Sequence, residues 1–543
     1  MSQGPPRHDI SQLFLAAAFF SVLMMAAMAR ADSRSSLEQL AQAKFGELSQ
    51  CEVKLLRALP DGQTAFCGSS ERGDDPSNNP INAAQWDHSR EIRGKLIRWV
   101  CSDREATQFV EPRGIQLYGA KVVGALDLNF VKIPFRVRIL RSSFGGPINL
   151  MYAEVPELNL NGSRTGAILA DELTVPGSIW LANGFHAEGK VDLLRAKLGA
   201  ELNCSGGEFV NPGGFALLAG GIHASDVLLR DGFLAKGEVD LVRANLTDDL
   251  ICDHGTFLNP SGNAINADGI TATEIMLRRG FRAEGVVKLQ RAKIAGSIDL
   301  VGGSFAELDL RQASASALRD GEEGWPPPGK LYLDGFVYHG IAEGPADAVS
   351  RARWLALQPD FVRQPYEQMA RVFAAVGDDV DSRKILIEME DQNRIRGSMN
   401  DQQWYWREPA KLGSWILRVT IGYGYAPWRA LYWSVGIVIL GAILFQKGKQ
   451  AGVIVPATER AESHYPFSPF WYSLDAFLPI VNLRQNEHWV PRPTTNSRWL
   501  GLKYDVFLRR YLWIHTLLGW TLTTLFAAGV TGIVSSGFAR INY

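Results

Sequence analysis

The stretch that decides the fold is residues 184–209, GFHAEGKVDLLRAKLGAELNCSGGEF, whose two phenylalanines open a series with a constant step of 24. Three series of apolar residues keep this step along the middle of the chain. They are Phe185, Phe209, Phe233, Phe257, Phe281 and Phe305; Leu193, Leu217, Leu241, Ile265 and Leu289; and Leu198, Ile222, Leu246, Ile270 and Ile294. A fixed period in this range is the signature of a solenoid, whose stacked coils bury a continuous core that no single coil could bury.

Short strand-like patterns fill each unit of this repeat. Pairs such as Val191 and Leu193 place apolar side chains two positions apart, on one face of a strand. A motif Gly-Phe-x-Ala-Glu/Lys-Gly recurs at twice the step, so alternate units differ; its copies are residues 184–189, 232–237 and 280–285. We therefore predict a parallel β-helix with about 24 residues per coil and roughly nine coils, stacked about 4.8 Å apart.

The predicted fold is mainly β, with an α-helical N-terminal cap, an α-helical linker hairpin and two C-terminal transmembrane helices around the β-helix. In the linker, Tyr366 to Gly377 also resembles the first helix of a tetratricopeptide unit. The expected boundaries are 1–31 for a signal peptide, 32–113 for the cap, 114–341 for the parallel β-helix, 342–410 for the linker and 411–543 for the membrane domain.

The N-terminal segment has the layout of a signal peptide. A short region with Arg7 precedes an apolar run over 13–29, and Ala29-Arg30-Ala31 matches the small-x-small cleavage pattern. An uncleaved anchor and a misassigned start codon are the alternative interpretations. Export would place the chain where disulfides form, and a bridge between Cys51 and Cys67 is then expected.

Two apolar runs predict membrane spans at about 428–446 and 512–534. The connection between them is rich in Lys and Arg, so the positive-inside rule places it in the cytoplasm and the β-helix outside. An apolar segment at 467–481 is expected to be interfacial. Span, short apolar segment and span is also the outline of an oligomeric two-helix pore subunit, although the carbonyl filter sequence of such channels is absent.

Composition excludes several classes of function. The formal net charge is −1, which gives no general attraction to nucleic acid. No phosphate loop, dinucleotide-binding glycine motif, His-Glu-x-x-His or Cys-x-x-Cys is present, so no cofactor or metal is predicted and the catalytic residues are unknown. Four histidines lack ligand spacing: His186, His223, His254 and His339. Cys204 and Cys252 share a predicted core column with Leu228, Met276 and Leu300, two coils apart, which is too far for a disulfide.

One surface feature is a candidate binding site. Arg195, Arg243 and Arg291 recur at twice the step and should form an exposed column. Guanidinium groups in a row could bind a polyanion or an anionic glycan. Asp192 and Asp240 recur beside them and would neutralise part of the column, which makes ordinary solvated surface charge the alternative.

The repeats resemble those of pentapeptide-repeat proteins, as in Val239-Asp240-Leu241-Val242-Arg243-Ala244-Asn245-Leu246. Those proteins form a four-sided β-helix from a five-residue cycle, and the step of 24 departs from any multiple of five. After about residue 86 the chain is also similar to a group of bacterial proteins called membrane-associated oxidoreductases. The similar stretches are Gln364-Pro365-Tyr366-Glu367-Gln368, Gly422-Tyr423-Gly424-Tyr425-Ala426-Pro427-Trp428-Arg429-Ala430-Leu431 and Gly519-Trp520-Thr521-Leu522-Thr523-Thr524.

These observations favour a membrane-tethered β-helix scaffold in the inner membrane of a bacterium, with the β-helix on the periplasmic or extracellular side. Its expected partners are the lipid bilayer and an envelope protein or polymer, and its membrane helices offer a surface for a homo-oligomer. The second resemblance implies a different class, a membrane-associated oxidoreductase, for which no catalytic motif can be assigned to residues of this chain. The pore subunit is the third hypothesis.

Overall fold

The computed structural model describes residues 36–68, 70, 75–396, 404–458, 466–478, 480–492, 498–499 and 502–531. The predicted signal peptide at 1–31 lies outside the described residues. The chain divides into two compact units, 1–359 and 360–543, which are considered separately.

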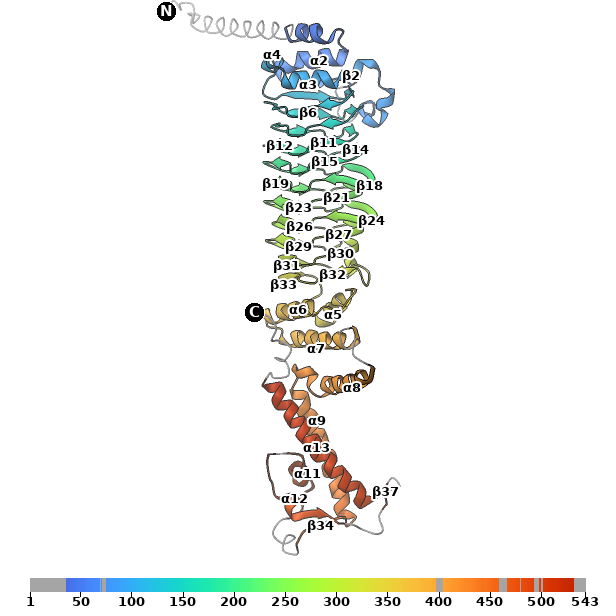
Figure 1. Cartoon of the computed structure of the whole chain (residues 1–543), viewed down its shortest axis with the longest axis vertical. Coiled ribbons are helices and arrows are strands. Elements are labelled where there is room, and N and C mark those ends of the chain that lie inside the picture. The colour runs from blue at the N-terminus through green and yellow to red at the C-terminus, as the bar shows by residue number, and fades with distance from the viewer. Residues whose placement is uncertain are drawn as a thin grey trace, which may run out of the picture. The chain divides into compact units, whose positions relative to one another are not determined.

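The first unit is a parallel β-solenoid of about 10 turns with about 23 residues per turn. Strands of successive turns lie above one another from β3 to β33 (Figure 1). Each regular turn contributes four short strand segments, as in β14 (His186–Glu188), β15 (Val191–Asp192), β16 (Lys197–Leu198) and β17 (Leu202–Asn203). The solenoid therefore has four faces, numbered here one to four in chain order.

Faces one and two share several long strands. Face one consists of β4 (Lys121–Val123), β7 (Ser143–Phe144), β10 (Arg164–Thr165), β14 and the first parts of β18 (Glu208–Leu218), β21 (Leu234–Asp240), β24 (Thr256–Asn266), β27 (Arg282–Lys288) and β30 (Ser304–Asp309). Face two consists of β5 (Leu126–Asp127), β8 (Ile148–Asn149), β11 (Ile168–Leu169), β15, the second parts of those long strands and β32 (Leu331–Tyr332).

Faces three and four are built mostly from shorter strands. Face three consists of β12 (Thr174–Val175), β16, β19 (His223–Ala224), β22 (Asn245–Leu246), β25 (Thr271–Ala272), β28 (Lys293–Ile294) and the first parts of β31 (Ser314–Arg319) and β33 (Val337–Glu343). Face four consists of β3 (Ile115–Tyr118), β6 (Val137–Leu140), β9 (Leu158–Asn159), β13 (Ile179–Trp180), β17, β20 (Val227–Leu228), β23 (Asp249–Ile251), β26 (Glu274–Met276), β29 (Ser297–Asp299) and the second parts of β31 and β33.

The backbone does not repeat with the constant step that the side-chain series predicted. Ala187 pairs with Phe209, whereas Phe209 pairs with Ala235, so a short turn is followed by a long one. This alternation continues to Phe305. The additional residues of the long turns protrude within β18 and β24, at 211–214 and 259–262. One long and one short turn together match the recurrence of the Gly-Phe-x-Ala motif, which preserves the average step.

The predicted phenylalanine series does form one buried column. Neighbouring ring centroids lie between 5.2 and 5.4 Å apart from Phe185 to Phe305. Successive rings come from two different backbone positions, because Phe185 precedes strand β14 while Phe209 lies inside strand β18. Full burial of such a side chain contributes roughly 1.5–3 kcal/mol, so this column is a main source of stability.

Two diagonally opposite corners turn through left-handed backbone. The corner between faces two and three, called the arginine corner, has positive φ in every turn; its residues are Phe130, Tyr152, Glu172, Arg195, Gly221, Arg243, Gly269, Arg291, Gln312 and Gly335. The corner between faces four and one has positive φ at Gly119, Arg141, Gly162, Asn183, Gly206, Asp231, His254, Arg279 and Gly302. The left-handed conformation costs free energy for a residue with a Cβ atom, so the backbone at both corners is conformationally constrained.

The N-terminal cap contains helices and also strands. A helix over 36–45 is followed by α2 (Gln50–Ala58), and the short helices α3 (Gly94–Ser102) and α4 (Arg104–Gln108) precede the first full turn. Four 3₁₀ turns lie between them, at Leu59–Asp61, Pro76–Asn78, Pro80–Gln85 and His88–Arg90. β1 (Ala65–Phe66) pairs with β3 and β2 (Glu91–Arg93) with β4, so sheet pairing begins before the predicted boundary at 114.

The other end of the solenoid is closed by α5 (Ala348–Leu355), after a 3₁₀ turn at Glu322–Gly324. Arg351 of α5 is fully buried and donates from both Nη atoms to Asp320, at 2.7 and 2.8 Å. Asp320 also accepts from Trp325 Nε1 at 2.8 Å. This cap belongs to the first unit, so the predicted linker 342–410 is divided between the two units.

The second unit is mainly helical. Its helices are α6 (Arg363–Ala375), α7 (Asp379–Arg396), α8 (Trp404–Ile421), a 3₁₀ turn (Gly422–Gly424), α9 (Trp428–Gln450), α11 (Pro469–Phe477), α12 (Gln485–His488) and α13 (Tyr504–Val530). Two antiparallel strand pairs accompany them: β34 (Ile454–Pro456) with β35 (Trp489–Pro491), which enclose α11 and α12, and β36 (Arg498–Trp499) with β37 (Leu502–Lys503). α9 and α13 run side by side with α11 against both (Figure 1).

Candidate functional site

The arginine corner carries the three predicted arginines at alternate turns. The side chains of Arg195 and Arg291 are 59% and 60% exposed, and Arg243 is also exposed. Arg195 Nε lies 2.8 Å from Glu172 Oε1, and Arg291 forms an ion pair with Asp268. The acids beside two of the arginines are therefore Glu172 and Asp268. Asp192, expected to neutralise this column, instead pairs with Lys190 at 2.6 Å.

Glycines occupy the corner positions between the arginines. A Cβ atom on Gly221 would lie 3.3 Å from Cγ of Arg195, and one on Gly269 would lie 3.5 Å from Cγ of Arg243. The arginine stems thus extend over the glycines of the following turns. The guanidinium groups are spaced two strands apart, about 9–10 Å, and two of the three are ion-paired, so an anionic chain bound there would compete with Glu172 and Asp268.

A pair of carboxylates lies beside this corner and escaped the sequence interpretation. Asp171 and Asp192 are on adjoining turns, and the pKa of Asp171 is raised to about 6 by burial and by its hydrogen bond and repulsion with Asp192. Lys190 and Arg195 oppose this rise. The two aspartates do not stand at the step of the apolar series, so a search for that step could not pair them. The raised pKa of Asp171 makes this part of the surface sensitive to pH.

A groove lies beneath the second protruding turn. It has a volume of about 560 Å³ and is lined by the turn at Pro260 to Gly262 and by Glu284 and Glu307 of the next strands. Glu307 is paired with Lys330 at 2.7 Å and Glu284 with Arg282. Both acidic side chains at the groove are therefore ion-paired.

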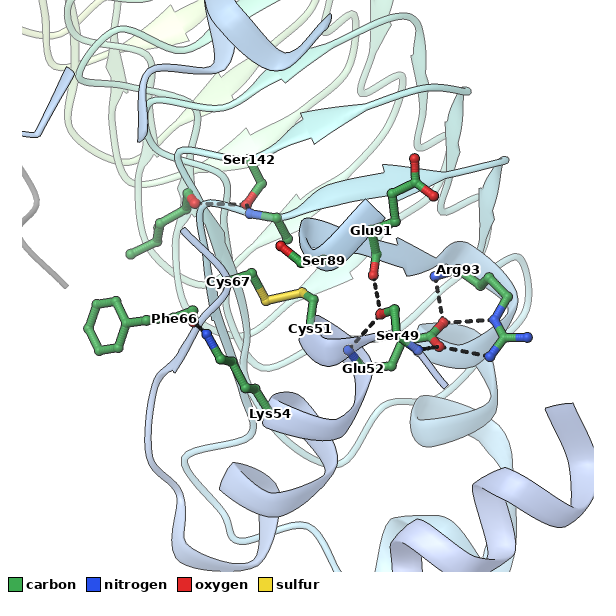
Figure 2. Close-up of a disulfide and its surroundings, with 12 residues drawn as sticks. Ser49, Cys51, Glu52, Lys54, Phe66, Cys67, Ser89, Glu91, Arg93 and Ser142 are labelled. Atoms are coloured by element: carbon green, nitrogen blue, oxygen red, sulfur yellow. Dashed lines mark hydrogen bonds and ion pairs between the residues drawn. A yellow bond between two sulfur atoms is a disulfide. The ribbon is translucent and has the colours of Figure 1, made fainter. Parts of the chain in front are cut away.

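The N-terminal cap holds the two cysteines predicted to pair. Cys51 and Cys67 form a disulfide with Cα atoms 5.0 Å apart, which joins α2 to the segment after β1 (Figure 2). Beside it, Glu52 is buried and bonds Arg93 through both carboxylate oxygens, each at 2.7 Å. Glu52 also completes a capping box with Ser49. Within the cap, α2 is thus fastened to the segment after β1 by a covalent bond and to β2 by an ion pair.

The other predicted core cysteines do occupy core positions. Cys204 and Cys252 are fully buried, and burial raises the pKa of each thiol well above its ordinary value. Neutral, inaccessible thiols are poor nucleophiles and poor metal ligands. These two side chains therefore contribute packing to the core of the solenoid.

The neighbours of these cysteines in the column differ from the prediction. The residues between and after them are Leu229 and Leu277, in place of the predicted Leu228 and Met276. The reason is that successive strands of face four, from β17 through β20 to β23, are not evenly spaced along the chain. A constant step therefore selects a residue one position away from the true neighbour.

The histidines of the solenoid remain scattered. His186 Nδ1 lies 3.1 Å from Glu208 Oε2, while His254 occupies a left-handed corner position. In the described part of the chain, no three side chains of His, Cys, Asp or Glu are placed to hold a metal ion.

In the second unit, α11 packs against the middle of α9 and α13. A Cβ atom on Gly441 would lie 2.3 Å from Ser473 Oγ, and one on Gly519 would lie 1.8 Å from the Phe477 carbonyl oxygen. The segment 467–481, predicted to be interfacial, contains α11. Because Gly441 and Gly519 have no side chain, α11 can approach the middle of α9 and α13.

A polar chain crosses this three-helix contact. Ser473 Oγ donates to the Val438 carbonyl at 2.8 Å, and His515 Nε2 lies 3.0 Å from the Ser473 carbonyl. Tyr511 Oη lies 3.3 Å from His515 Nδ1. His515 is fully buried, with aromatic rings of Phe445 and Phe477 around it. Both ring nitrogens have partners, so the chain can hold the three helices together.

The stretch from Gly422 to Leu431 contacts α7 and α8 through polar groups. Tyr423 has φ of 56° and donates from Oη to Asp391 Oδ1 at 2.9 Å. Asp391 also pairs with Arg418 Nε at 2.8 Å. The stretch 364–368 lies on α6, where Arg363 forms ion pairs with Glu367 and with Glu390 of α7. These sequence features thus serve helix junctions in the second unit.

Comparison of the chain with protein-family models, with curated proteins and with solved structures finds no match. Function must therefore be argued from the chemistry of the described residues.

Proposed function

We propose that this protein is a membrane-tethered β-helix scaffold of the bacterial cell envelope whose side surface binds an envelope protein or an anionic polymer. The observation that carries the proposal is a regular solenoid in one chain with two helices that are long and apolar enough to cross a membrane, Trp428–Gln450 and Asp505–Val530. A closed solenoid offers a long rigid surface, and apolar helices would fix it at the bilayer.

Orientation follows from charge. The basic connection between the two apolar helices favours the cytoplasm, which would put the solenoid on the outer side of the inner membrane. A disulfide between Cys51 and Cys67 agrees with that side, since disulfides persist in oxidising compartments.

Membrane attachment and orientation can be tested together. The full chain should remain in the membrane after alkaline carbonate extraction. Alkaline phosphatase fused after Pro359, at the boundary between the units, should be active if the solenoid is exported. Release by carbonate would overturn the tether, and activity of a cytoplasmic reporter alone at Pro359 would overturn the orientation.

The binding surface can be tested with an acidic polysaccharide as the probe. The detergent-solubilised full chain should bind polyglucuronate in a salt-sensitive manner, and the triple variant R195Q/R243Q/R291Q should lose at least tenfold in affinity. The matched control R141Q/R230Q/R279Q removes the same charge at the diagonal corner, where Arg230 precedes the corner residue Asp231, and should bind like the wild type. Equal losses in both variants would contradict a site at the arginine corner.

A pore subunit is a second candidate, favoured by the position of α11. A short helix held at the middle of two spanning helices is a re-entrant arrangement, which occurs in membranes only where protein or water surrounds it. An oligomeric channel requires conductance in planar bilayers and a symmetric oligomer on sizing. A monomer without conductance would remove this candidate.

The oxidoreductase activity implied by resemblance stays a prediction. An absorbance spectrum of the detergent-purified chain tests it, since bound flavin or haem would be visible and a blank spectrum would count against it.

A further inference from the structure

The junction between α8 and α9 is unusual in combining exposed arginines with exposed aromatic rings. A hollow of about 410 Å³ at this place is lined by Arg418, Val419, Arg429, Tyr432 and Trp433. It lies where the apolar helix Trp428–Gln450 begins, at the depth expected for lipid headgroups if that helix spans the bilayer.

The charge in this hollow is incompletely balanced. Arg418 pairs with Asp391 at 2.8 Å. Arg429 donates from Nη1 to the Arg418 carbonyl at 3.3 Å and makes no ion pair within the described residues. Its guanidinium group therefore keeps donors free for an anion beside the first turn of α9, where the helix dipole also favours negative charge.

The surrounding surface matches a membrane boundary. On α8, Leu412, Trp415 and Ile416 lie on one helical face and are 60%, 51% and 40% exposed. The opposite face of α8 packs inward through Leu417 and Ile421. A helix that is apolar on both faces needs a second apolar environment, which an acyl-chain boundary supplies.

Aromatic rings complete the hollow. Trp433 Nε1 donates to the Val419 carbonyl at 3.2 Å, which fixes its ring between the two helices, while Trp433 and Tyr432 remain 48% and 72% exposed. Trp and Tyr gather at the headgroup level of membranes because one end of each ring is apolar and the other polar. Arginine donors framed by such rings are the chemistry that recognises a lipid phosphate.

We propose that the hollow between α8 and α9 binds the phosphodiester headgroup of an anionic phospholipid, with Arg429 as the main contact and Arg418 as the second. The inference rests on the proposed membrane attachment and names a lipid ligand for it. Bound lipid stabilises the second unit, because it supplies the anion that Arg429 lacks and covers the outer face of α8.

The test uses the full chain in nanodiscs of phosphatidylcholine with or without phosphatidylglycerol. Phosphatidylglycerol should raise the melting temperature of the wild type, and Arg429→Gln should lose at least half of this rise. Arg429→Lys, which keeps the charge but not the fork, should lose less. Lys447→Gln removes an exposed charge from the other end of α9 and should keep the full rise, because general surface attraction would affect both ends.

Native mass spectrometry provides a second readout. The wild type should retain phosphatidylglycerol on transfer from mixed nanodiscs, and Arg429→Gln should retain severalfold less. An equal response of the Arg429 and Lys447 variants, or no response to phosphatidylglycerol, would overturn the site. Stabilisation by soluble glycerol 3-phosphate to the same extent would also overturn it, because the ligand would then be a free phosphate.

Carbonate extraction separates this inference from the proposed function. A chain that stays in the membrane without headgroup selectivity overturns only the lipid site. A chain released by carbonate overturns the tether and the lipid site together.

Discussion

Single glycines decide where the long turns of the solenoid can protrude. Gly285 has φ of +136°, and a Cβ atom there would lie 2.3 Å from the Asn259 carbonyl oxygen. Gly237 stands in the same relation to Asn211, at 2.5 Å. The final glycine of the second and third copies of the Gly-Phe-x-Ala motif is thus explained by the protruding turn that crosses over it, while Gly189 of the first copy has only its positive φ of 122° in common with them.

Replacing Gly285 by Ala should therefore destabilise the solenoid. The expected loss in free energy of unfolding is about 1–3 kcal/mol, from backbone strain and a clash with main-chain oxygen. Chemical denaturation followed by circular dichroism measures it. Gly340→Ala is the control, because no heavy atom lies within 4 Å of its Cβ position and its φ is not positive. Similar losses for both variants would contradict the steric explanation.

The Asp171 carboxyl predicts a dependence of stability on pH. Its pKa is raised from 3.8 to about 6, so the folded state binds this proton more tightly than the unfolded chain. The stabilisation of the folded state by this proton is fully present below about pH 4 and is lost as the pH rises through about 6. Asp240 and Asp249 have pKa values raised by burial and act in the same direction.

Asp171→Asn should reduce the fall in melting temperature between pH 4 and pH 7, because the amide cannot ionise. Thermal unfolding at intervals across this range measures the slope. A slope identical to that of the wild type would show that ionisation of Asp171 does not destabilise the folded state.

At the scale of elements, the sequence revealed side-chain columns but not backbone register. The phenylalanine series was visible because each long turn of backbone is followed by a short one, which restores the average step. The sequence could not predict the four-sided cross-section or the shift of one position beside Cys204. The reason is that side chains from two different backbone positions can contribute to one column. Register became evident only from the pairing of strands.

The phenylalanine column predicts a large effect for one core substitution. Phe233→Ala should lower the free energy of unfolding by about 3–5 kcal/mol, because the ring is fully buried between two others and its loss leaves a cavity. Phe215→Ala is the matched control, since Phe215 is 36% exposed in β18, directly after the protruding residues. Equal melting temperatures for the two variants would contradict a packed column.

The disulfide should stabilise the N-terminal cap. It closes a separation of 16 residues between Cys51 and Cys67, and loops of this size correspond to about 3 kcal/mol. In C51S/C67S, amide hydrogen exchange should increase in α2 and β1 while the turns beyond β14 keep their protection. Wild-type protein held in reductant should behave like the variant, and unchanged exchange in both would argue against a structural role.

At the scale of the whole molecule, the sequence located the solenoid, the two apolar helices and the arginine column. It missed the partners of those arginines, since the ion pair of Glu172 with Arg195 joins adjacent turns at a spacing that the repeat search did not test. It also missed the hollow at Arg418 and Arg429, which exists only because α8 turns sharply into α9. Sites built from unlike segments leave no periodic signal.

The division at Pro359 predicts that the solenoid with both caps folds alone. A chain of residues 32–359 should be soluble, β-rich and cooperative on melting, because α5 covers the last turn and Arg351 compensates buried Asp320. A chain ending at residue 341 is the control. It lacks α5, leaves a buried carboxylate unpaired at a cost of about 3–5 kcal/mol, and exposes a sheet edge that invites aggregation. Size-exclusion chromatography and circular dichroism distinguish the two. Equal aggregation of both chains would show that α5 is not sufficient for the first unit to fold alone. The second unit would then be needed for its folding.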